Sequence, residues 1–153
     1  MTSKRTDPYW QAQDILSRRD HSETEVRQKM GRQGFSSLEI ERAIEQLYVN
    51  KLLNDHQFAR RYVENLLERK LIGPRYLAAK LKQRGIAPDI IAAAIERGFT
   101  GDRSEESCLA RAADQWKRSH RQHEHDRERL QRFLLSRGFS LDVIYSYLQK
   151  DLE

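Results

Sequence analysis

Three stretches of this sequence share one pattern, in which an amphipathic run ends at a glycine followed by an apolar residue: VRQKMGRQGF (residues 26–35), LAAKLKQRGI (77–86) and LQRFLLSRGF (130–139). The glycines, Gly34, Gly85 and Gly138, are 51 and 53 residues apart. A period of this length predicts a tandem repeat whose units stack side by side. Such an array offers an elongated surface, which favours binding a large partner over turnover of a small substrate.

Apolar residues recur at the same four distances from each glycine: four and eight residues before it, and six and ten residues after it. These spacings place the residues of each group on one face of a helix. We therefore expect them to form the core of each unit. They are Val26, Met30, Ile40 and Ile44, then Leu77, Leu81, Ile91 and Ile95, then Leu130, Leu134, Ile144 and Leu148.

Helix start and stop signals divide the chain into nine predicted helices. Capping residues or proline open them at Asp7-Pro8, Ser22, Ser36, Asn54 or Asp55, Gly73-Pro74, Pro88, Ser104 and Ser140, and no stretch alternates as a strand would. The start of the remaining helix is not assigned, because the middle of the last unit, around residues 117–126 (KRSHRQHEHD), is the least predictable part of the chain. The predicted fold is all-α, one helical-repeat domain over residues 1–153 with three three-helix units at approximately 7–53, 54–100 and 104–152. The sequence does not decide between a curved and a straight array.

Composition agrees with a thin, soluble array. Charged residues make up 33% of the chain and hydrophobic residues 38%, and the formal net charge is +5. This balance favours polyanions or acidic protein faces as partners. The single cysteine, Cys108, excludes an intramolecular disulfide and fits a reducing compartment. We expect no membrane segment and no signal peptide, and therefore a cytoplasmic protein.

Residues 69–88 hold six basic residues and no acidic one. Such a band is typical of a binding face for a polyanion or an acidic protein, and Tyr76 adds a ring on which a base could stack. The alternative is a solvated face that only keeps the protein soluble. A second basic stretch, residues 117–137, is interrupted by acids and is expected to pair within its helix. The candidate binding residues are Arg69, Lys70, Arg75, Tyr76, Lys80, Lys82 and Arg84, joined by Arg18, Arg19, Arg27 and Lys29 if the first hairpin brings those four together.

No pattern in the chain indicates catalysis or a cofactor. His120, His123, His125 and Asp126 include ligand types that suit zinc, but their spacing matches no closed zinc site, and a polar hinge is the simpler interpretation. We therefore expect no metal and no enzymatic activity. Trp10 and Trp116 are predicted to anchor the packing of their helices.

Several segments together closely resemble the RecX family of bacterial regulatory proteins. They are LSRRDHSETEVRQKM (residues 16–30), LLNDHQFARRYVENLLERKLIGPRYLAAKLKQRGI (52–86) and RFLLSRGFSLDVI (132–144). The most diagnostic points are Asp20-His21-Ser22, Phe58-Ala59, Gly73-Pro74 and Arg137-Gly138-Phe139. The likeness covers nearly the whole chain.

The resemblance implies a protein that binds the RecA recombinase filament on DNA, lies in its helical groove, and restrains its ATP hydrolysis, strand exchange and coprotease activity. It also implies tandem three-helix units, and we expect a monomer. Two residues depart from the family pattern: Asn54 stands where a second Asp is common, and Lys80 where an acidic residue is common. The alternative is a general DNA-binding helical protein that acts on single or double strands through phosphate contacts.

Overall fold

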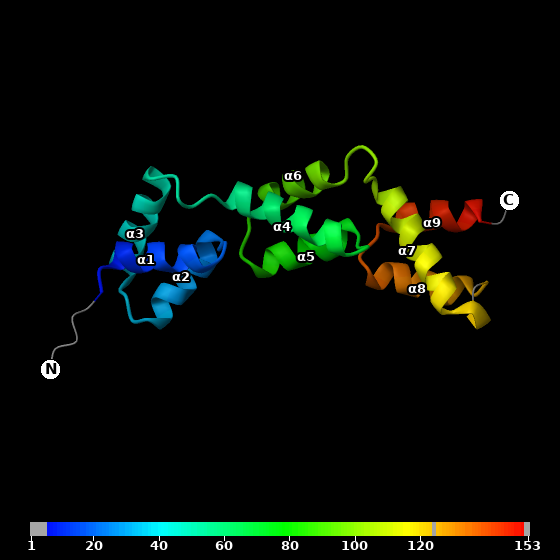
Figure 1. Ribbon diagram of the computed structural model, residues 1–153, viewed down its shortest axis with the longest axis horizontal. Helices are drawn as coiled ribbons and strands as arrows, with labels where there is room; N and C mark the ends of the chain where they lie inside the picture. Colours follow the sequence, from blue (N-terminus) through cyan, green and yellow to red (C-terminus); the bar gives the residue numbers. More distant parts are fainter. Residues whose placement is uncertain (1–5, 124, 152–153) are drawn as a thin grey trace.

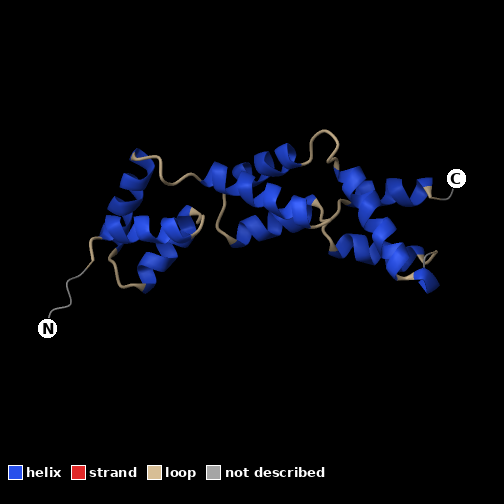
Figure 2. Cartoon of the chain, viewed as in Figure 1, coloured by secondary structure: helices blue, strands red, loops and turns tan. Residues whose placement is uncertain are grey.

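The computed structural model describes residues 6–123 and 125–151, and this part of the chain is all-helical, without a strand (Figures 1 and 2). The nine predicted helices are confirmed within these residues, and a short 3-10 turn at Arg121–His123 is added. The helices are α1 (Pro8–Arg18), α2 (Glu23–Arg32), α3 (Ser37–Val49), α4 (Asp55–Arg69), α5 (Pro74–Gln83), α6 (Pro88–Gly98), α7 (Glu105–Ser119), α8 (Arg127–Ser136) and α9 (Leu141–Lys150).

Three units of three helices lie in a row, with the first unit at one end and the third at the other (Figure 1). Each unit has its own cluster of buried apolar side chains. The clusters draw on the residues that share the glycine register, since eleven of the twelve are buried and Ile95 packs against its cluster from a partly exposed position. The tandem repeat of three-helix units predicted from the sequence is therefore confirmed.

The two tryptophans differ in burial. Trp116 is 7% exposed and packs in the third core, as predicted, whereas Trp10 is 55% exposed. The prediction for Trp10 was wrong. In α1 the buried residues are Ala12 and Ile15, and the helical period places them on the side of the helix opposite Trp10.

The helices α2, α5 and α8 all end in the same glycine turn. The φ angles of Gly34, Gly85 and Gly138 are +88°, +77° and +84°, in the left-handed region that glycine adopts without a steric penalty. After each glycine, the next N–H donates back to a carbonyl five residues earlier, at 3.2 Å for Phe35 to Met30, 3.2 Å for Ile86 to Leu81 and 3.3 Å for Phe139 to Leu134. This is the Schellman arrangement, which ends a helix and turns the chain toward the next one.

The glycine turn at the end of α8 also forms the joint between the second and third units. The N–H of Gly73, which precedes α5, donates to the carbonyl of Arg137 at 2.9 Å. The N–H of Arg75, the second residue of α5, donates to the carbonyl of Gly138 at 2.9 Å. The start of α5, with unsatisfied donors, thus meets the end of α8, with unsatisfied acceptors, and the two helix dipoles align head to tail.

At the joint between the first and second units, the donors again come from the residue before a helix and from the second residue of that helix. Here they are side-chain hydroxyls instead of backbone N–H groups. The Ser22 hydroxyl, just before α2, donates to the carbonyl of Arg84 at 2.6 Å, and the Thr24 hydroxyl, on the second residue of α2, donates to the carbonyl of Gly85 at 3.2 Å. As a result α8, α5 and α2 follow one another head to tail along one edge of the array (Figure 1).

A second contact at this joint involves the start of α4. Asn54 caps α4, because its side-chain oxygen accepts from the N–H of Gln57 at 3.1 Å. The cap is therefore kept, although Asn54 stands where an Asp is common in the family. The Asp55 carboxylate instead accepts from the N–H of Glu23 across the joint at 2.9 Å. Of the two residues considered as the start of α4, Asn54 therefore caps the helix within the second unit, and Asp55 bonds to the first unit.

His21 is buried beside the same joint, with 3% of its surface exposed. Its Nδ1–H donates to the carbonyl of Arg19 at 2.8 Å, while Nε2 is buried without a hydrogen-bond partner among the described residues. Burial lowers the pKa of His21, because a proton on Nε2 would place an unpaired charge in the interior. The positive charges of Arg19 and Lys29 act in the same direction, against the opposing effects of the Arg19 carbonyl and of Glu25.

The joint can be tested by comparing two glycine substitutions. Gly34→Ala and Gly138→Ala place a side chain at nearly the same φ angle, which costs about 1–2 kcal/mol at either site. A Cβ at Gly34 would meet no atom within 4 Å, whereas one at Gly138 would overlap the backbone of Tyr76. We expect Gly138→Ala to lower the free energy of unfolding by about 1–3 kcal/mol more than Gly34→Ala does in urea titrations. Equal losses would mean that the close approach at Gly138 does not hold the units together.

Stability should depend on pH through His21. Its folded-state pKa lies below the unfolded value of about 6.5, so the unfolded chain binds the proton first as the pH falls. The free energy of unfolding should therefore fall as the pH drops below about 7.5, by at most about 1.4 kcal/mol per pH unit from this residue.

Urea unfolding at several pH values measures this slope, and His21→Gln should reduce it. NMR titration of the imidazole protons gives the pKa of His21 in the native protein. A value at or above 6.5 would contradict the assignment.

Candidate binding surface

The basic band of residues 69–88 falls on the end of α4 and on the exposed side of α5. Arg75 and Lys82 are seven residues apart and exposed on α5. The ring of Tyr76 is near two cations, with Lys70 Nζ 5.9 Å and Lys80 Nζ 5.5 Å from its centroid. Such contacts hold long cationic side chains near one another while their charges stay available to a partner.

Arg84 differs from the other cations of the band. Its guanidinium contacts the Glu25 carboxylate of the first unit at 3.1 Å and lies 5.5 Å from the centroid of the Tyr62 ring. Residues 69–88 contain no acid, but the fold supplies one from a segment 59 residues away in the sequence. A local charge pattern could not reveal this ion pair. Arg84 therefore also stabilises the joint between the first and second units.

Glu25 organises the charges at this joint. Its carboxylate also binds Arg19, at 3.1 Å, and accepts from the N–H of Ser22 at 3.2 Å. Burial alone would raise the pKa of Glu25, but the Ser22 N–H and the two guanidinium groups outweigh it and lower the pKa below its usual value. The carboxylate thus stays ionised at neutral pH and neutralises part of the positive charge around it.

Two more of the first-unit candidates are held in ion pairs. Arg18 contacts Asp14 at 3.3 Å, and Arg27 contacts Glu23 at 3.2 Å and Glu41 at 2.7 Å. Lys29 has no ion pair with any described acidic side chain, and it lies near enough to His21 to affect its pKa. Three of the four first-unit candidates are therefore partly neutralised by neighbouring acids.

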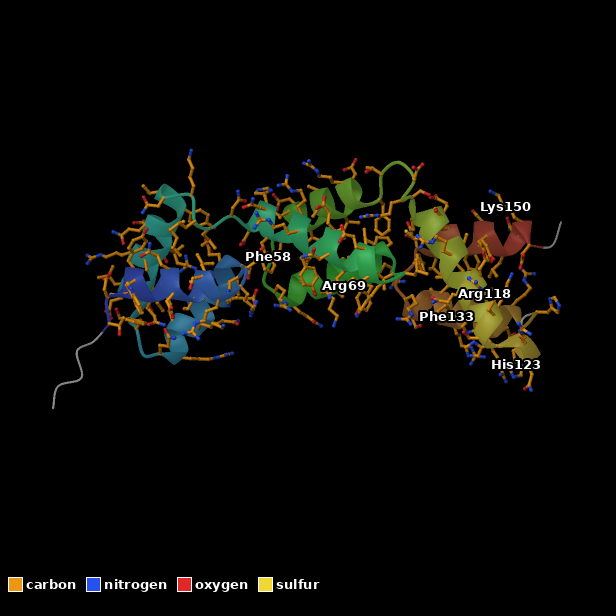
Figure 3. The ribbon with its side chains drawn as sticks, viewed as in Figure 1. Phe58, Arg69, Arg118, His123, Phe133 and Lys150 are labelled. Carbon is orange, nitrogen blue, oxygen red and sulfur yellow. The ribbon has the colours of Figure 1, made fainter. Side chains whose placement is uncertain are left out.

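A groove of about 690 Å³ runs between the second and third units. Five cations and a single acid, Glu68, line it together with Phe133. Its two sides are marked in Figure 3 by Arg69, on the second unit, and by Phe133, on the third. None of the five cations forms an ion pair with an acidic side chain in residues 6–123 or 125–151. The cations are Arg69, Lys70, Arg103, Arg111 and Arg137.

Three of these cations were not among the residues selected from the sequence. Arg103 lies in the connection before α7 and Arg111 within α7, and neither belongs to a run of basic residues. Arg137 was expected to pair within its helix, but its guanidinium instead lies 5.4 Å from the centroid of the Phe133 ring. The signal that could have indicated Arg137 is its place beside Gly138, where two units meet.

The histidine segment and the cysteine both pack within the third unit. In the part of the chain that the structure describes, no group of three or more His, Cys, Asp or Glu side chains is placed to hold a metal ion. The ring of His120 stacks on Trp116, with centroids 4.7 Å apart. Burial raises the pKa of the Cys108 thiol, which keeps it protonated and a poor nucleophile. Among the described helices, none combines the length and the apolar character that a bilayer crossing requires.

Fold and surface together define an all-helical repeat protein, built from three three-helix units and carrying exposed basic faces. Family models match all three units, as the first three-helix domain of RecX (residues 9–47), the second (54–95) and the third (104–148). The chain belongs to the RecX family, a family of proteins that regulate RecA.

Solved structures agree with this assignment. The crystal structure of RecX from Lactobacillus salivarius has a TM-score of 0.85 and 24% identity, over 95% of this chain and 96% of that one. A crystal structure described as regulatory protein RecX has a TM-score of 0.82 and 25% identity, over 94% of this chain and 71% of that one. No curated protein sequence gave a significant match. These likenesses extend over the whole array of units.

Proposed function

We propose that this chain binds the RecA filament on DNA and inhibits its ATPase, strand-exchange and coprotease activities by occupying its surface. Family membership supports the partner. The observation that supports the location is a set of exposed or half-exposed cations, without ion pairs to the described acids, along the second unit of the array. The contact surface consists of Arg69, Lys70, Arg75, Tyr76, Lys80 and Lys82.

The remaining candidates have a smaller part in this proposal. Arg84, Arg18, Arg19 and Arg27 already contact carboxylates, so a partner gains less from each of them than from a cation without a counter-charge. Their exposed surfaces can still touch the filament at its margin, and Lys29 keeps its charge available. The uncompensated cations speed encounter with an acidic surface, and shape fixes the register of the complex.

The elongated form supports binding to a polymer of identical subunits. Three units in a row can contact successive positions of a helical filament, as repeat proteins do with extended partners. In this proposal the chain acts as a monomer in the cytoplasm and needs no cofactor. Inhibition then follows from binding alone and requires no reaction on the chain.

A second candidate function is general DNA binding, which the groove between the second and third units favours because its cations form no ion pairs with the acids that the structure describes. Binding of this kind depends mainly on neutralising phosphates. The two functions differ in their preferred ligand. Equal affinity for naked and RecA-coated DNA would favour the second, and stronger binding to the coated strand would favour the first.

Charge reversal on α5 tests the proposed contact surface. Arg75→Glu with Lys82→Glu should raise the amount of protein needed for half-inhibition of RecA ATP hydrolysis by more than about tenfold, because two attractive charges become repulsive. The measurement uses filaments assembled in advance, with DNA in excess of what the protein could coat.

Arg32→Glu with Arg42→Glu is the matched control, since both residues are exposed on the first unit and Arg32, like Lys82, lies in the last turn of its helix. We expect this control to inhibit within about twofold of the unaltered protein, and both variants should pass the same thermal unfolding check. Equal inhibition by the two variants would exclude the α5 face as the contact surface.

A further inference from the structure

The two joints of the array differ in what they bury. At the second joint Phe99 packs against the apolar clusters of both the second and the third unit, and Leu71, from the connection before α5, packs against the third. At the first joint no apolar side chain is shared in the same way among the described residues, because every apolar side chain in or against the first cluster lies within residues 7–53. The second and third units are therefore joined by apolar packing as well as by hydrogen bonds, whereas the first joint is polar.

Hydrogen bonds and ion pairs hold the first unit to the second. Contacts of this kind are individually weak in water, because each replaces a contact that the same groups make with solvent. A joint made of them can open while the helices on both sides stay folded. In the described residues the contacts are Ser22 to the Arg84 carbonyl, Thr24 to the Gly85 carbonyl, Glu23 to Asp55, Arg84 to Glu25 and Arg61 to Asp20.

His21 lies buried at this joint and has no part in the proposed contact surface. Its neighbours on both sides bond to the second unit, Asp20 to Arg61 and Ser22 to Arg84. The imidazole is 3% exposed, and its Nε2 has no hydrogen-bond partner among the described residues. A neutral imidazole fits this position, whereas a proton on Nε2 would create a buried donor and a buried charge without a partner.

The charges at the joint do not compensate an imidazolium at this position. Arg19 and Lys29 act against protonation, and Glu25, which favours it, already binds Arg19 and Arg84. The second unit adds the cation Arg61 from α4, so no carboxylate is left over for His21. The charged groups that face the joint are Arg19, Asp20, Glu23, Glu25 and Lys29 from the first unit and Asp55, Arg61 and Arg84 from the second.

We propose that the first joint is a hinge that loosens when His21 takes up a proton, so that the first unit swings as an arm on a rigid body formed by the second and third units. The imidazolium leaves the interior to reach water. Because Ser22 follows His21 directly, the bond from its hydroxyl to the Arg84 carbonyl is then lost, and α2 separates from the end of α5.

The hinge changes the reach of the chain without changing its cationic surface. The cations of α5 and those of the groove both lie on the rigid body, and Lys70 belongs to both sets, so they remain one continuous surface. The first unit, at one end of the array in Figure 1, alters its position relative to that surface. The hinge is a property of the isolated chain and does not depend on the proposed action on RecA.

Two amides report on the two joints separately. The Glu23 N–H, at the start of α2, donates to Asp55 across the first joint, and the Arg75 N–H donates to Gly138 across the second. Amides in the first turn have no acceptor within their own helix, so their protection from hydrogen exchange measures how firmly each joint is closed. NMR of the unaltered full chain, from pH 7.5 to pH 5.5, follows both amides in one sample.

Opening places the imidazole in water, where its pKa is about 6.5, while the closed joint binds the proton less tightly. The protection of Glu23 should therefore fall as the pH drops below about 6.5, by up to about tenfold per pH unit and at least about threefold in all by pH 5.5. The protection of Arg75 should stay within about twofold, after correction for intrinsic rates.

His21→Gln removes the titrating group, and its amide can still donate to the Arg19 carbonyl. In this variant the protection of Glu23 should stay within about twofold over the same pH range. His123→Gln, which makes the same change in the third unit, is the matched control and should keep the pH dependence of the unaltered protein.

Three results would overturn the proposal. Equal losses at both amides would mean that protonation unfolds the whole chain rather than one joint. The same loss in His21→Gln would assign it to a carboxylate of the joint, and constant protection of Glu23 would mean that the joint does not open. If His21→Gln does not fold, the unaltered protein decides, since a loss that begins near pH 6.5 supports His21 and one that begins only below about pH 5 indicates carboxylates and contradicts the hinge.

Discussion

The carbonyl groups at the ends of α8 and α5 are the acceptors on which the array depends. A helix end leaves carbonyls without partners and a helix start leaves donors without partners, and here each is satisfied by a neighbouring unit. The glycine turns make the approach possible, because Gly138 and Gly85 adopt left-handed angles and present no side chain to the incoming helix. Units that are each too small to be very stable alone thereby support one another. The same glycine turn thus ends the helix, redirects the chain and accepts hydrogen bonds from a neighbouring unit.

The same joints determine which cations are available to a partner. At the first joint, the Glu25 carboxylate draws Arg19 and Arg84 into ion pairs, so their charges mainly stabilise the array. At the second joint the groove has only Glu68 as an acid, and its cations remain without counter-charges among the described residues. The two joints therefore differ: the first holds cations that are paired across it, and the second holds a groove of cations without such pairs in the described part of the chain.

Much of the fold could be predicted because its determinants are local. The glycine register identifies the core residues of all three units, and capping residues such as Ser22 and Ser36 define helix starts without knowledge of the rest of the chain. The binding site was harder to predict from the sequence than the fold. Arg84 looked like an available cation until the fold brought Glu25 to it, and Arg103 and Arg111 belong to no basic run, since only packing between units places them together. Trp10 shows a similar limit, because a helical pattern alone does not say which side of α1 is covered.

Hydrogen exchange of two amides, followed by NMR, tests the joint most directly. Arg75 and Asp89 each follow the proline that opens a helix, and such amides have no acceptor within their own helix. The Arg75 N–H donates to Gly138 of the next unit, whereas no backbone acceptor for the Asp89 N–H is found in the described part of the chain. If the head-to-tail joint holds the array in solution, Arg75 will exchange at least about a hundredfold more slowly than Asp89, after correction for their intrinsic rates. Similar protection of the two amides would contradict a fixed joint and, with it, the continuous binding surface.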